Sequence, residues 1–98
     1  MEYQLVIRFS SENIDRLHEA EDKLAHGMAA LAEVDGHDIG AGEMNIFLFT
    51  AGPVEALKRI REILGDSLPS GWKAAYRPVE EENYIVLWPE GCTEFDIA

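Results

Sequence analysis

The chain has 98 residues, of which 47% are hydrophobic, and 19 acidic against eight basic residues give it a formal net charge of −11. This length predicts a single domain over residues 1–98, and the hydrophobic content predicts a folded chain rather than a disordered one. The charge excludes nucleic acid and anionic membrane surfaces as expected partners, because both would repel the protein at long range.

The first elements predicted along the chain are a strand and a helix. Residues 3–9 alternate apolar and polar side chains, which is typical of a strand. A helix follows two candidate capping serines, and Glu21 interrupts its apolar stripe. The apolar members of that stripe are Ile14, Leu17, Leu24, Met28 and Leu31. Gly27 within this run predicts close packing against the sheet or an early helix end.

A hairpin and a second helix come next. Residues 33–41 have weaker strand character, a glycine-rich turn follows, and residues 44–50 predict a strong strand. Pro53 suits the first position of the second helix, and Gly65 suits its end. The buried stripe expected for this helix is Val54, Leu57, Ile60 and Leu64.

The last predicted elements are a strand over residues 72–79 and a short strand or packing arm over residues 84–88. The order β-α-β-β-α-β indicates an α+β fold of the ferredoxin-like, split βαβ kind. Two helices would then cover one face of a four-stranded antiparallel sheet formed by residues 2–79. Residues 80–98 would form an acidic arm, because they contain six acids and no Lys or Arg.

Both faces of the strand at 44–50 carry large apolar side chains. Helices can cover only one of these faces, so the other needs a cover or exposes an apolar patch. The segment 84–88 could provide that cover. The alternative is a second copy of the chain, and a homodimer is therefore one of the expected assemblies.

The richest candidate site lies within residues 34–50. In an extended strand Asp35 and His37 point to one face and Asp38 to the other, while Glu43 can return towards them across a tight turn. Two interpretations stay open for this hairpin: a polar β-turn, and a divalent-metal or small-molecule site made by these four residues. No other cofactor is implied.

The remaining polar groups predict no catalytic set. His18 and His26 lie eight positions apart on the first helix, which does not give a shared ligand sphere, so surface polar roles are expected for both. No Ser, Thr or Cys stands in a nucleophile motif. A second set of candidate ligand or interface residues is aromatic and polar. It consists of Asn45, Phe47, Phe49, Tyr76, Arg77 and Trp88.

The run Asp35-Gly36-His37-Asp38-Ile39-Gly40-Ala41-Gly42-Glu43-Met44-Asn45-Ile46-Phe47 resembles the central hairpin of small, uncharacterised bacterial proteins of ferredoxin-like fold. This resemblance implies an architecture only, and it assigns no activity to any residue.

Three functions follow as alternatives. The first is a small acidic, non-catalytic binding protein with a basic protein partner. The second is a metal-binding or small-molecule-binding domain that uses the 35–43 hairpin. The third is a dimeric enzyme with a site lined by Asn45, Phe47, Tyr76 or Arg77. The single cysteine, Cys92, and the absence of a leader-like or membrane-spanning run predict a cytoplasmic location.

Overall fold

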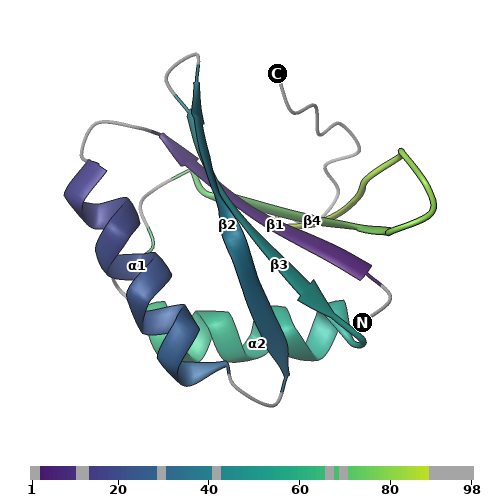
Figure 1. The fold of residues 1–98 in the computed structure, drawn as a ribbon, viewed down its shortest axis with the longest axis horizontal. Coiled ribbons are helices and arrows are strands. Elements are labelled where there is room, and N and C mark those ends of the chain that lie inside the picture. Colours follow the sequence, from purple (N-terminus) through teal and green to yellow (C-terminus); the bar gives the residue numbers. More distant parts are fainter. Residues whose placement is uncertain are drawn as a thin grey trace.

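The computed structural model describes residues 3–10, 14–28, 31–40, 43–65, 68 and 71–88. Within these residues the chain is an α+β fold, as the sequence predicts, in which two helices pack on one face of a five-stranded antiparallel sheet (Figure 1). The elements are β1 (Tyr3–Ser10), α1 (Ile14–Gly27), β2 (Ala32–Gly40), β3 (Glu43–Thr50), α2 (Pro53–Leu64), β4 (Lys73–Pro78) and β5 (Ile85–Trp88).

The strands follow the order β2-β3-β1-β4-β5, so β1 lies at the centre and β2 and β5 lie at the edges. In β1, Leu5 faces Leu48 of β3 on one side and Tyr76 of β4 on the other. The four-stranded sheet expected from the sequence is corrected to five strands, because β5 pairs with β4 and places Val86 opposite Ala75. The segment predicted as a strand or an arm is therefore an edge strand.

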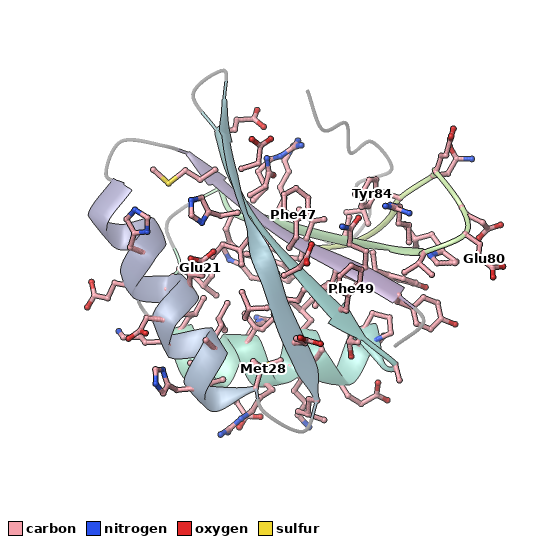
Figure 2. All side chains as sticks on the ribbon, viewed as in Figure 1. Glu21, Met28, Phe47, Phe49, Glu80 and Tyr84 are labelled. Carbon is pink, nitrogen blue, oxygen red and sulfur yellow. The ribbon has the colours of Figure 1, made fainter. Side chains whose placement is uncertain are left out.

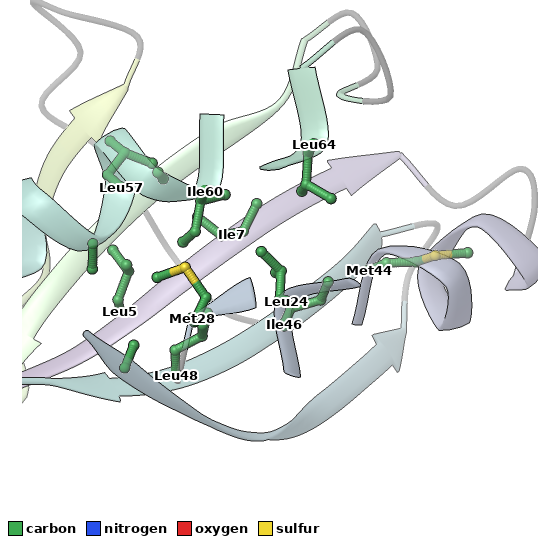
Figure 3. Close-up of a cluster of buried hydrophobic side chains, with 13 residues drawn as sticks. Leu5, Ile7, Leu24, Met28, Met44, Ile46, Leu48, Leu57, Ile60 and Leu64 are labelled. Atoms are coloured by element: carbon green, nitrogen blue, oxygen red, sulfur yellow. The ribbon is translucent and has the colours of Figure 1, made fainter. Parts of the chain in front are cut away.

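The main hydrophobic core fills the space between the helices and the sheet (Figure 3). Its large members include Leu5, Ile7, Leu24, Met28, Met44, Ile46, Leu48, Leu57, Ile60 and Leu64. Two residues of the predicted stripes are instead exposed. Leu31 lies beyond the end of α1, and Val54 points outwards because the buried stripe of α2 passes through Pro53 and Ala56. The side chains of Ile14 and Leu17 lie outside the described residues.

Glycines end both helices, for different reasons. Gly65 has a φ of 46°, a conformation that favours glycine, and its N–H donates to the carbonyl of Arg61. Gly27 is the last residue of α1, and a Cβ there would lie 2.6 Å from Cδ1 of Ile63. The close approach at Gly27 is therefore made with α2 rather than with the sheet.

The face of the sheet opposite the helices carries a second, smaller apolar cluster. Val6 and Ala75 are fully buried there, although neither α1 nor α2 covers this face. Phe47, Tyr84 and Val86 pack against them. Both faces of the sheet thus exclude water near its centre, and the expectation that both carry apolar groups is confirmed.

No helix in the described part of the chain is long and apolar enough to cross a membrane. Of the predicted acidic arm at 80–98, the structure describes the part up to Trp88, and Cys92 lies outside the described residues.

A buried hydroxyl joins the end of β3 to the segments on either side of it. Thr50 is fully buried, and its Oγ1 donates to the carbonyl of Leu31 at 2.7 Å. The same oxygen accepts from the N–H of Gly52 at 3.1 Å, just before α2 begins. This single side chain therefore fixes the start of β2 against the start of α2.

We expect Thr50→Val to lower the free energy of unfolding by about 1–3 kcal/mol, because valine keeps the shape of threonine but leaves both backbone groups without this partner. Thr50→Ser is the matched control, since it keeps the hydroxyl and loses one methyl, at a cost of about 0.8 kcal/mol. Urea denaturation of the two variants measures the difference. A valine variant as stable as the serine variant would show that these hydrogen bonds contribute little.

Candidate functional site

An irregularity in β2 decides where His37 points. The register pairs Val34 with Leu48 but Gly36 with Phe47, so Asp35 is an extra residue without its own partner on β3. A bulge of this kind shifts every later side chain to the other face of the sheet. His37 consequently pairs with Ile46, whose side chain lies in the main core, and faces the layer that contains the helices.

On that face His37 meets two residues of α1. Its Nδ1 lies 2.8 Å from Oε2 of Glu21, a side-chain hydrogen bond that joins the edge strand to the helix. The ring of His18 stands edge-on to the ring of His37, with centroids 5.3 Å apart at an angle of 86°. Figure 2 shows Glu21 between α1 and β2. One ligand atom from each of these three residues lies within 4.8 Å of the other two.

The three residues border a shallow hollow of about 520 Å³ between α1 and β2. Asp22 and Asp35 also line this hollow, so three carboxylates surround it with two imidazoles. His26 does not belong to the cluster: its Nδ1 lies 2.8 Å from the carbonyl oxygen of Asp22, and its side chain is 80% exposed.

The structure divides the hairpin residues that the sequence grouped together. Asp35 and His37 border the hollow on the helix side. Asp38 pairs in register with Asn45 and so lies on the open face of the sheet. Glu43 is bound on that face as well, with its Oε2 2.9 Å from Nε of Arg8.

Two members of the observed cluster were missed by the sequence analysis. His18 was considered only together with His26, whereas its neighbour in space is His37 on another element. Glu21 carried the signal that could have identified the site, because it is an acid within an otherwise apolar helical stripe. Its carboxylate is only 23% exposed, which indicates that it faces inwards towards a partner.

The second predicted set, of ligand or interface residues, is also split between the two faces. Asn45, Phe47, Phe49 and Arg77 alternate with core residues and lie on the open face. Tyr76 packs against the main core, with its ring edge-on to Tyr3 at 5.7 Å.

Trp88, the last member of this set, also lies on the helix side. It stacks on Trp72, with ring centroids 5.5 Å apart and an interplanar angle of 15°. The guanidinium of Arg61, from α2, lies 4.6 Å from the centroid of the Trp88 ring, a cation–π distance. These contacts attach β5 to α2, which is a packing role.

The open face presents an apolar surface with a polar border. We define the open-face patch as Phe47, Phe49, Tyr84 and Val86, which are partly exposed, and Val6 and Ala75 lie buried beneath it. At one side Arg8 donates from Nε to Oδ1 of Asn45 at 3.0 Å and pairs with Glu43.

At the other side of the patch, a turn leads from β4 to Tyr84, and Glu80 lies at its outer end (Figure 2). Arg77 Nη1 donates to the carbonyl of Glu81 at 2.8 Å, and the Tyr84 hydroxyl donates to Oε1 of Gln4 at 3.0 Å. These bonds hold residues 79–84 as a loop beside the patch. The loop carries three exposed acids, Glu80, Glu81 and Glu82.

Comparisons of this chain with protein-family models, with curated proteins and with solved structures find no match.

We expect Tyr84→Phe to speed amide exchange over residues 79–83 by up to about tenfold. The ring stays in the patch, but the bond to Gln4, worth about 0.5–1.5 kcal/mol, is lost. Hydrogen exchange followed by mass spectrometry measures this. Tyr3→Phe is the control, because its ring packs on Tyr76, on the helix side of the sheet. Unchanged exchange in Tyr84→Phe would mean that the hydroxyl does not hold the loop.

Proposed function

We propose that this protein is a small acidic, non-catalytic binding protein that contacts a basic protein partner through the open-face patch. The observation that carries the proposal is the patch itself, a set of aromatic and aliphatic side chains on the sheet face that the helices leave free. An apolar centre enriched in aromatic residues and surrounded by polar groups is the usual build of a protein interface.

The charge around the patch favours a basic partner over a second copy of this chain. Glu80, Glu81 and Glu82 are exposed on the loop beside Tyr84, and Asp38 lies on the same face near Asn45. Two copies would each bring a net charge of −11 to the contact and would repel each other. A partner with an apolar anchor flanked by Lys or Arg could place the anchor on the patch and its basic residues against the acidic border.

We also propose that the fold is ferredoxin-like, with β5 as an addition at one edge. The support is the order β-α-β-β-α-β over β1 to β4, with all neighbouring strands antiparallel. The likeness of the 35–47 hairpin to small bacterial proteins of this fold stays a prediction. Because this fold serves many unrelated functions, the assignment adds nothing about activity.

The dimeric enzyme has less support from the geometry. Its expected site combined Asn45, Phe47, Tyr76 and Arg77, but Tyr76 lies on the opposite face of the sheet from the other three. Asn45 is 4% exposed, and its side-chain oxygen accepts from Arg8, while Arg77 binds backbone carbonyls. Asn45 and Arg77 are therefore already bound to structural partners.

We expect Phe49→Ser to weaken capture of the partner from native lysate by about five- to thirtyfold, because interface aromatics of this kind contribute about 1–2 kcal/mol. The charge substitution Glu80→Lys with Glu82→Lys should weaken capture as well, and that part of the binding should fall as salt rises. Quantitative pull-down at low and high salt measures both effects.

Val54→Ser is the matched control, since it removes an apolar side chain that is 61% exposed on α2, away from the patch. If the Phe49→Ser and Val54→Ser variants capture equal amounts of the partner, the proposal is contradicted. A wild-type protein whose mass in solution is that of a dimer and whose dimer is lost in Phe49→Ser would contradict it as well, because the patch would then be occupied by a second copy.

A further inference from the structure

We propose that His18, Glu21 and His37 form a binding site for one divalent transition-metal ion of the Zn²⁺ type. This site lies on the side of the sheet opposite the open-face patch and is independent of the binding function proposed above. It also differs from the hairpin site that the sequence suggested, because two of its three ligands come from α1.

The two elements present the three side chains to one point. His18 and Glu21 are three residues apart on α1, a spacing that places both on the same side of a helix. The bulge at Asp35 turns His37 of β2 towards them. Their ligand atoms already lie within 4.8 Å of one another, and the closest pair is 2.8 Å apart. Around a tetrahedral Zn²⁺ with bonds of 2.0–2.1 Å, neighbouring ligand atoms are about 3.3 Å apart.

Only small movements are needed to close the site. The Glu21–His37 hydrogen bond, at 2.8 Å, opens by about half an ångström if an ion replaces its proton. The side chain of His18 is exposed and on a helix surface, so it can rotate towards the ion. Side-chain rotation can therefore bring the three ligand atoms to one ion, without a change in the backbone.

The types of ligand decide the class of ion. Imidazole nitrogen suits Zn²⁺, Ni²⁺ and Cu²⁺, whereas Mg²⁺ and Ca²⁺ require oxygen ligands almost entirely. Two imidazoles with one carboxylate are a known set of three protein ligands for zinc, with the fourth position left to water. Here that position would face the hollow, where Asp22 and Asp35 add negative charge that attracts cations.

Glu21 gives a reason to prefer this account over a simple ion pair. The side chain of Glu21 is 23% exposed, so its carboxylate is partly removed from water, and His37 is its one hydrogen-bond partner among the described residues. The nearby ring of His18 adds a second imidazole that the pair does not need. A bound ion uses all three groups and joins α1 to the edge strand β2.

The test is calorimetric titration of the tag-free full chain, carrying Cys92→Ser to remove the thiol, with ZnCl₂ alone. We expect one ion per chain and a melting temperature that rises with ion concentration. His18→Ala and His37→Ala should each lower the association constant by more than about tenfold, because removing even an outer-shell partner of a metal ligand costs 10–100-fold. Mg²⁺ should give no saturable heat and no melting shift.

His26→Ala is the matched control, because it removes an exposed histidine from the same helix and should leave zinc binding unchanged. Circular dichroism shows whether each variant folds. If His37→Ala unfolds, His18→Ala still tests the site, because the exposed side chain of His18 can be removed without unfolding the chain. The proposal is overturned if the wild type shows no saturable one-site binding. It is equally overturned if His18→Ala binds as tightly as the wild type, or if His26→Ala loses as much affinity as His18→Ala.

Discussion

The central strand, β1, is buried from both sides, and this burial determines where the other elements must lie. Leu5, Val6 and Ile7 are consecutive in β1, and all three have an exposed fraction of 0%. Successive side chains of a strand point to opposite faces, so water must be excluded from both faces of the sheet at this place. The helices provide the cover for Leu5 and Ile7, and Phe47, Tyr84 and Val86 provide it for Val6.

That constraint separates the two surfaces on which function can lie. The cover over Val6 is made by side chains of the sheet itself, so their outer sides form the open-face patch. On the helix side the core is closed, and polar groups gather where α1 meets the edge strand β2. The bulge at Asp35 is the local feature that creates this second site, because in a regular strand His37 would pair with Asn45 and would face the patch instead.

The periodic parts of the chain are those that the sequence could predict. The strands and helices follow from alternating or helical spacing of apolar residues, and Pro53 and Gly65 mark the limits of α2 as expected. The uncovered face was predictable from Phe47 and Phe49, which alternate with core residues on β3. The pairing of β5 as a fifth strand was one of two alternatives, because four residues contain too little pattern to choose between a strand and an arm.

The candidate metal cluster was less predictable, for a physical reason. Its residues come from a helix and a strand, and the distance between His18 and His37 depends on how α1 packs and on one extra residue in β2. A bulge has no clear signature in a stretch that already contains several glycines and acids. Glu21 alone was visible as an anomaly, and burial was needed to show that it faces inwards.

The position of the His37 ring decides whether the candidate metal cluster forms and which side chains of β2 border the patch, and we would measure it by proton–proton nuclear Overhauser contacts. The account predicts contacts from the imidazole protons of His37 to those of His18 and to side-chain protons of α1. Contacts from His37 to Phe47 or Asn45 instead would place the ring on the open face. They would show that β2 has no bulge at Asp35, and both the cluster and the border of the patch would have to be redrawn.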